Sequence, residues 1–239
     1  PFNISTLMTK SYTDPEFGEI TISFRSGMRM IRISVRADGR LKASAPKYTP
    51  LIAIKAMVTT QRQQIRNLFG KHVLPAAYAD GQQIGKSHHL VVVTANIATP
   101  SIKVLGQNIM LRLPTSVSLI DPDIQRLIRD TVIKVLRVQA KAYLPRRLKN
   151  IASNNGYTYQ RVRFSHAGTR WGSCSSTGTI SLNIALMKLP DELIDYVLMH
   201  ELSHTKHMNH SAAFWAELCT MDPHYKLHKQ QIHRHTPTI

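Results

Sequence analysis

Two histidines one helical turn apart, with a glutamate directly after the first, have the most evident chemistry in this 239-residue sequence: His200, Glu201 and His204. Side chains four residues apart share one helix face, about 6 Å apart along the axis, so both rings can approach one metal ion at roughly 2.0–2.1 Å. Glu201 is rotated by about 100° from His200, which makes it unsuitable as a ligand but able to reach a water on that ion. This HExxH spacing predicts zinc-activated water with Glu201 as its general base.

A catalytic zinc site takes three protein ligands, and His207 and His210 are the candidates for the third. If the helix continued, His207 would lie about 4.5 Å farther along the axis than His204 and would stretch away from the ion. If the chain instead turns near Met208 and Asn209, with Asn209 in a left-handed conformation, His210 can return beneath the metal. A closed structural zinc site or surface histidines are the alternatives. We expect one zinc ion per chain on three ligands: His200, His204 and His210.

The segment before the motif predicts the helix that positions it. Pro190 is favoured near the first position of a helix, and the two acidic residues that follow it suit the positive end of the helix dipole. Leu193 and Val197 share a helix face with both motif histidines, because offsets of three and four residues keep side chains together. The histidine rings are therefore expected to point inward, at the end of an apolar stripe.

The first half of the chain has the pattern of short strands. Apolar and polar residues alternate in runs that predict an antiparallel sheet, over residues 20–24, 30–35, 89–94 and 102–113. Apolar residues recur at helical spacing over residues 50–69, which predicts one helix. The sequence shows no internal repeat.

After Pro122 an apolar stripe at helical spacing predicts a long amphipathic helix, which Pro145 is expected to end or kink. Strands are expected over residues 157–164 and 179–184, on either side of a Gly- and Ser-rich turn, and helices follow. The fold class is therefore α+β. We expect a β-rich N-terminal half with one helix and a helical C-terminal half with a small antiparallel sheet, as domains 1–120 and 121–239.

The net charge and the two cysteines indicate which partners and which cellular compartment to expect. The formal net charge is +17, with 31 Lys and Arg against 14 Asp and Glu, which attracts nucleotides or nucleic acid; a well-solvated basic surface is the alternative. Cys174 and Cys219 cannot form a disulfide framework, so a reducing compartment is the simpler assumption. The first ten residues lack a signal-peptide pattern and no apolar run could span a bilayer, so we expect a cytoplasmic protein with no membrane partner.

The residues around the motif closely resemble the YgjP-like family of zinc metallopeptidases, relatives of the WLM and SprT-type proteins. The resemblance rests on three segments: Arg170-Trp171-Gly172-Ser173-Cys174-Ser175-Ser176, Ile180-Ser181-Leu182-Asn183, and His200 to Ser211 with Phe214-Trp215. It implies a zincin-like catalytic half with zinc on His200, His204 and His210 and Glu201 as base, preceded by a β-rich half. It does not imply a particular substrate.

Several residues are candidates for substrate binding beside the metal. A zincin places a strand along its cleft to hold an extended substrate, and Trp171, Gly172 and Ser173 would form it, with Gly172 allowing a close backbone approach. Trp171 could equally be a core residue. The candidates to stabilise an oxyanion, each with a structural role as the alternative, are Ser173, Arg170, Asn183 and Tyr225.

Three functions compete on these observations. The leading hypothesis is a zinc-dependent hydrolase, most simply a peptidase, in which metal-activated water attacks an amide of a peptide or protein. The second keeps the same site but hydrolyses a phosphorylated substrate such as a nucleotide, which the net charge of +17 would attract. The third is a DNA-associated protease or a nucleic-acid-binding protein, as the SprT-type resemblance suggests.

Overall fold

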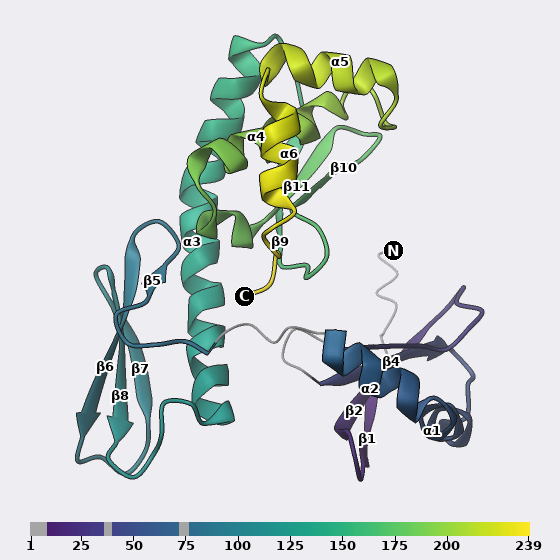
Figure 1. Ribbon diagram of the computed structural model, residues 1–239, viewed down its shortest axis with the longest axis vertical. Coiled ribbons are helices and arrows are strands. Elements are labelled where there is room, and N and C mark those ends of the chain that lie inside the picture. The colour runs from purple at the N-terminus through teal and green to yellow at the C-terminus, as the bar shows by residue number, and fades with distance from the viewer. Residues whose placement is uncertain (1–8, 36–39, 72–76) are drawn as a thin grey trace, which may run out of the picture. The chain divides into compact units, whose positions relative to one another are not determined.

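The computed structural model describes residues 9–35, 40–71 and 77–239, without the side chains of residues 69–71 (Figure 1). The chain divides into two compact units, residues 1–76 and 77–239, and each has a hydrophobic core of its own. Mixed sheets and helices occur in both, which confirms the α+β class. Among the described helices, none is both long and apolar enough to cross a membrane.

The first unit is a four-stranded sheet with two helices. Its strands lie in the order β1-β2-β4-β3, and α1 and α2 replace the single helix expected over residues 50–69, with Gln61 between them. Alternate apolar residues of β2 and β4 are buried against α1 and α2, as the strand pattern predicts. The elements are β1 (Thr9–Asp14), β2 (Gly18–Arg25), β3 (Arg32–Val35), β4 (Leu41–Pro46), α1 (Leu51–Thr60) and α2 (Arg62–Lys71).

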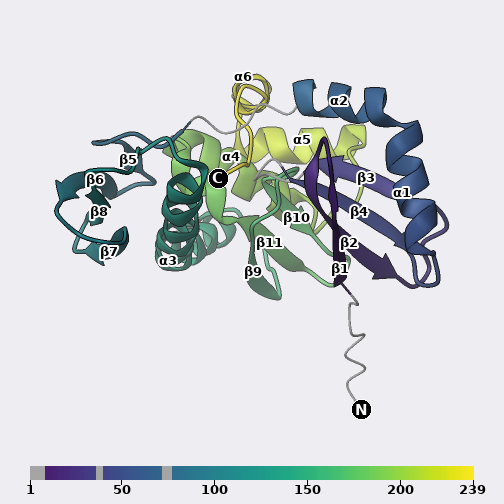
Figure 2. The same ribbon diagram turned by 90° about the horizontal axis from the view of Figure 1, so that it is seen from below.

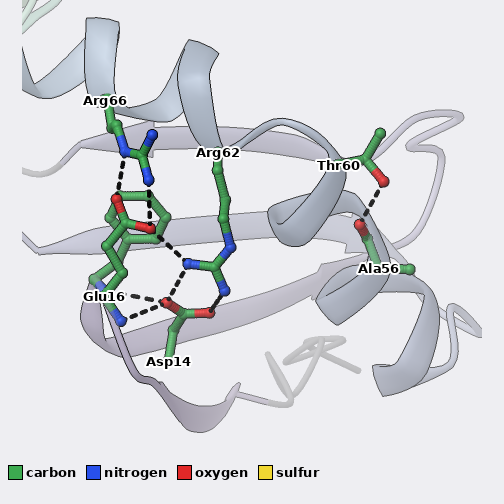
Figure 3. A network of polar contacts seen from close by, with 7 residues as sticks. Asp14, Glu16, Ala56, Thr60, Arg62 and Arg66 are labelled. Atoms are coloured by element: carbon green, nitrogen blue, oxygen red, sulfur yellow. Dashed lines mark hydrogen bonds and ion pairs between the residues drawn. The ribbon is translucent and has the colours of Figure 1, made fainter.

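An ion network ties the β1–β2 turn to α2 (Figure 3). The Arg62 guanidinium donates to Asp14, with 3.1 Å between Nη2 and Oδ2, and to Glu16 at 2.7 Å. Arg66 donates to the same Glu16 carboxylate. Asp14 also accepts the backbone N–H groups of Glu16 and Phe17, so its carboxylate both shapes the turn and anchors the helix.

The second unit begins with another four-stranded sheet, which packs on the long helix α3 (Pro122–Asn154). Gln139 of α3 donates to the Ile84 carbonyl and accepts from the Lys86 amide, so it holds the turn between the first two strands. The strands are β5 (Gln83–Ile84), β6 (His88–Ala95), β7 (Ser101–Leu105) and β8 (Asn108–Pro114). Because this sheet and α3 share one core, the boundary expected at residue 120 does not coincide with the division between compact units.

The two four-stranded sheets have the same topology. Each has a parallel central pair, in which Thr21 lies opposite Lys42 and His89 opposite Asn108, with an antiparallel strand on either side. In each of these two sheets the strand that comes last in the chain, β4 or β8, ends at a proline and a helix is the next element. The topology therefore occurs twice, although the sequence shows no repeat, and the expectation of purely antiparallel pairing was wrong.

A third sheet and the remaining helices lie on the other side of α3 from the β5–β8 sheet (Figures 1 and 2). Strand β11 pairs with β10 antiparallel but with β9 parallel, so this sheet is mixed and not antiparallel as expected. Strand β10 is one of its two edge strands; it lies in the Gly- and Ser-rich segment predicted as a turn and overlaps the strand that the family resemblance implied at Trp171, Gly172 and Ser173. The elements are β9 (Arg161–Ser165), β10 (Gly172–Cys174), β11 (Thr179–Asn183), the 3-10 helix η1 (Ile184–Lys188), α4 (Asp191–Ser203), α5 (Ala212–Met221) and α6 (Tyr225–Ile232).

Pro145 does not end α3, which continues to Asn154. A proline inside a helix removes one hydrogen bond and costs about 3 kcal/mol or more. Leu144, Leu148 and Ile151 lie on both sides of this point and are all buried in the core of the second unit. Their burial holds both parts of α3 against one core and offsets the unfavourable proline.

Replacing a buried leucine of α3 should destabilise the second unit far more than replacing an exposed one. Leu144 has no exposed surface, so Leu144→Ala should lower the free energy of unfolding by about 2–5 kcal/mol. Leu227, which is 52% exposed on α6, is the matched control, and Leu227→Ala should change it by less than about 0.5 kcal/mol. Urea denaturation of both variants measures the difference, and equal losses would contradict this core.

Candidate metal site

Three imidazoles converge where α4 ends. His200 lies in the last turn of α4, His204 follows its last residue, and His210 comes from the loop before α5. Their ligand nitrogens all lie within 4.8 Å of one another, and 3.1 Å separates the Nε2 atoms of His200 and His210. Ligands of a tetrahedral ion at about 2.0–2.1 Å lie roughly 3.3 Å apart, so the Nε2 atoms of His200 and His210 have the spacing of atoms that share an ion, and a nitrogen of His204 lies within reach of the same position.

The loop after α4 brings His210 back to the helical pair. The amides of Lys206 and His207 both donate to the Ser203 carbonyl, which turns the chain directly after the helix. The chain bends at Met208 and Asn209 as expected, but the left-handed conformation expected for Asn209 was wrong, because no described residue other than glycine has a positive φ. The helix ends several residues earlier, so no left-handed residue is needed.

His207 contributes its backbone to the site and not its imidazole. Its carbonyl oxygen lies 2.9 Å from Nδ1 of His204, which can donate to it and so keep Nε2 free as a ligand atom. The imidazole of His207 is not a member of the histidine cluster. The preference for His210 over His207 therefore agrees with the geometry.

Two aromatic residues at the start of α5 support the cluster. The Phe214 ring is fully buried, and its centroid lies 5.0, 4.6 and 4.8 Å from those of His200, His204 and His210. Trp215 stacks on His210 at 5.6 Å, with 28° between the ring planes. Because α5 begins directly after His210, these rings fix the loop that delivers the third imidazole.

The Glu201 carboxylate is buried against the backbone of β10. Its side chain is 4% exposed, and a Cβ atom built on Gly172 would lie 2.5 Å from Oε1 and 2.7 Å from Cγ. Only glycine leaves room for this approach. Among the described residues, Oε2 of Glu201 and Nδ1 of His200 are two of the buried side-chain atoms without a hydrogen-bond partner.

Burial sets the protonation of the site without a metal. Desolvation raises the pKa of Glu201 to about 8, against a smaller lowering by Arg170. Desolvation and the neighbouring His204, His210 and Lys229 lower the pKa of His200 to about 3. The first imidazole is therefore neutral at physiological pH, which is the form that binds a metal.

Two hollows flank the histidines and share Gly172, His200, Glu201 and His210 among their lining residues. The first has a volume of about 390 Å³ and is lined in addition by Trp171, Tyr196, Val197, Trp215, Lys229, Ile232 and His233. The second, of about 400 Å³, is lined in addition by Arg170, Ser173, Cys174, His204 and Met208. The sequence did not predict Lys229, Ile232 and His233 as lining residues, because no local pattern brings them to the motif.

The residues that the sequence predicted to bind substrate differ in whether they line the hollows. Trp171, Gly172, Ser173 and Arg170 line the hollows, and Trp171 also packs against the core. Asn183 is fully buried, and its amide donates to the carbonyls of Ala167 and Arg170 and accepts from the Ala185 amide. Tyr225 stacks on Trp215 and lines neither hollow. The contacts of Asn183 and Tyr225 are those of structural residues.

The donor set fits a metal ion. Three imidazole nitrogens on one side and a buried, unpaired carboxylate oxygen beside them match a catalytic zinc site, which keeps one coordination position for water. An imidazole set also suits other first-row metals. The residues of this chain that would hold the ion are His200, His204 and His210.

Adding a methyl group at Gly172 should disturb the site. Gly172→Ala forces either the Glu201 carboxylate or β10 to move, which should lower the free energy of unfolding by about 1–3 kcal/mol. Gly168→Ala, in the same connection, meets only Thr238 at 3.9 Å and should change stability by less than about 0.5 kcal/mol. Chemical denaturation compares them, and a neutral Gly172→Ala would contradict the close approach.

The chain matches the YgjP-like, metallopeptidase domain family over residues 29–235. Two solved structures are similar to part of it. The metallopeptidase zymogen of Pyrococcus abyssi abylysin is 30% identical, with a TM-score of 0.35 over 37% of this chain and 90% of that one. The metallopeptidase zymogen of Methanocaldococcus jannaschii jannalysin is 22% identical, with a TM-score of 0.34 over 38% of this chain and 93% of that one.

No curated protein matches the chain. Because the family match spans most of its length, this protein belongs to the YgjP-like metallopeptidase family of metal-dependent hydrolases.

Proposed function

We propose that this protein is a zinc-dependent peptidase in which His200, His204 and His210 hold one zinc ion and Glu201 is the general base. The observation that supports this most strongly is the burial of the Glu201 carboxylate, which lines the same hollow as the three convergent imidazoles. A structural zinc site needs no such carboxylate, because its four ligands close the coordination sphere.

Each residue has a distinct task in this proposal. His200, His204 and His210 would hold the zinc ion, which would supply an activated water and a Lewis acid for the substrate carbonyl. The task of Glu201 would be to accept a proton from the attacking water and to pass it to the leaving amine. The Gly172 backbone and the water-excluding contacts around Glu201 keep its carboxylate in one position for both transfers.

The edge strand β10 offers a binding mode for an extended peptide. It pairs only with β11 in the described sheet, so its other edge can hydrogen-bond to a substrate backbone. Gly172 and Ser173 of β10 line the hollows beside the histidines. A peptide added to this edge would pass the metal with its scissile amide near Glu201.

A peptide or protein substrate is the one that the family supports. The nucleotide and nucleic-acid alternatives rest on the net charge of +17, and no comparison supports them. A mixture of unstructured peptides and a panel of nucleoside triphosphates, each incubated with the zinc-loaded protein, separates the substrate classes. Release of phosphate without peptide cleavage would contradict the proposal.

Removing the base should stop hydrolysis and leave the metal. Glu201→Gln keeps the shape of the side chain but cannot accept a proton, so peptide hydrolysis should fall by about 10²–10⁴-fold. Metal analysis of the same variant should still give one zinc per chain. Hydrolysis at the wild-type rate would show that another residue is the base.

The third ligand is tested by a matched pair of histidine variants. His210→Ala removes a ligand atom and should lower zinc affinity by at least about tenfold, whereas His207→Ala removes a ring that lies outside the cluster and should leave affinity unchanged. Competition with a chromogenic chelator measures both. A larger loss in His207→Ala would assign the third ligand to His207.

A further inference from the structure

The hollow of about 390 Å³ beside the histidines is a pocket with apolar walls from four parts of the chain. Trp171 comes from the connection before β10, Tyr196 and Val197 from α4, Trp215 from α5 and Ile232 from α6. Ile232, Tyr196 and Val197 are buried, so these walls belong to the core and do not depend on a mobile surface loop. The pocket is therefore largely preformed.

Apart from Glu201, the polar side chains that line this pocket are cationic or neutral. Lys229 of α6 and His233, which directly follows α6, line the pocket, and Nζ of Lys229 lies 4.2 Å from the centre of the Trp215 ring. Glu201 is the only carboxylate among the lining residues, and it lies beside the histidines. A side chain bound in the pocket would thus meet aromatic walls and a positive charge.

The second hollow has a different character. It is lined in addition by Arg170, Ser173, Cys174 and Met208 and by none of the large aromatic side chains. A chain that passes the metal therefore meets large aromatic side chains in only one of the two hollows. This asymmetry is what a peptidase needs in order to select one residue next to the bond that it cleaves.

We propose that the aromatic pocket binds a large neutral apolar side chain, above all an aromatic one, of the substrate residue adjacent to the scissile amide, and that it rejects lysine and arginine. This rests on the proposed peptidase function and adds the substrate class. A dry cavity of about 150 Å³ suffices for a benzene ring, so a volume of about 390 Å³ accommodates such a side chain. Trp171, and the part of the Trp215 ring that His210, Tyr225 and Lys229 leave open, offer surface for aromatic packing.

Two unfavourable contributions to the binding free energy should make the pocket reject basic side chains. An ammonium or guanidinium in the pocket would lose water without gaining a carboxylate partner, since Glu201 is committed to the metal end. It would also lie near the charge of Lys229, and like charges at close range oppose binding. Neutral apolar side chains meet neither penalty.

Peptide hydroxamates test the pocket by binding, without turnover. Two series of hydroxamates, with the variable side chain on the acyl or on the amine side of the zinc-binding group, would carry benzyl, methyl or aminobutyl side chains. Titration calorimetry of the zinc-loaded protein should show, in one series, the benzyl compound binding at least about tenfold more tightly than the other two. The protein's two tryptophans both line the pocket, so their fluorescence should change with the benzyl compound.

The Lys229→Met variant tests the effect of the Lys229 charge separately from that of the shape of the pocket. It should strengthen binding of the aminobutyl compound by at least about threefold and change the benzyl compound by less than about twofold, because the aliphatic cover of Trp215 is kept. Lys226→Met is the matched control, since Lys226 is exposed on the same helix and does not line the pocket. It should leave both affinities unchanged.

The outcomes distinguish the pocket from the metal site. If no hydroxamate binds, the proposed function fails and the pocket with it. If hydroxamates bind but benzyl, methyl and aminobutyl compounds have equal affinity in both series, the metal site stands and the pocket proposal is overturned. Tight binding of the aminobutyl compound to the unchanged protein would overturn the rejection of basic residues.

Discussion

The approach of β10 to the Glu201 carboxylate is the constraint on which the rest of the site depends. A Cβ atom at residue 172 would overlap that carboxylate at 2.5 Å, so only glycine allows the edge strand to lie against α4. The contact buries the carboxylate, which lines the same hollow as the three imidazoles, and places a strand edge at that hollow. The proposed general base, metal ligands and substrate strand thus share one close backbone contact.

The surrounding fold makes this contact rigid. Helix α4 packs on α3 and contributes buried apolar residues to one core, so the histidines extend from a fixed helix end. Phe214 packs against all three imidazoles and Trp215 against the third, which ties the loop of His210 to α5. Asn183 bonds the backbone of the connection that leads to Trp171 and Gly172. Packing therefore fixes the positions of the three imidazoles.

The parts of the site that depend on neighbouring residues in the sequence were predictable. The spacing of His200 and His204 fixes a shared helix face, and reach along the axis favours His210 over His207, as the geometry of the cluster supports. The helix start at Asp191 follows from proline and two carboxylates. These inferences need only helix geometry and local electrostatics, which the sequence contains directly.

What the sequence could not supply depends on contacts between distant segments. Parallel pairing of β2 with β4 and of β6 with β8, and the packing of the β5–β8 sheet on α3, arise from tertiary structure and leave no periodic signal. The aromatic pocket needs Ile232 and Lys229 of α6, about thirty residues beyond the motif by the numbering. Burial of its apolar residues in the core also keeps α3 continuous through Pro145, although a proline locally favours the end of a helix.

X-ray absorption at the zinc edge tests the coordination most directly. The wild-type protein should show three imidazole nitrogens and one further oxygen or nitrogen at about 2.0–2.1 Å, and His210→Ala should show one imidazole fewer. A sulfur ligand at about 2.3 Å would contradict an open three-histidine centre, because Cys174 lines the hollow beside it. An unchanged imidazole number in His210→Ala would equally refute it.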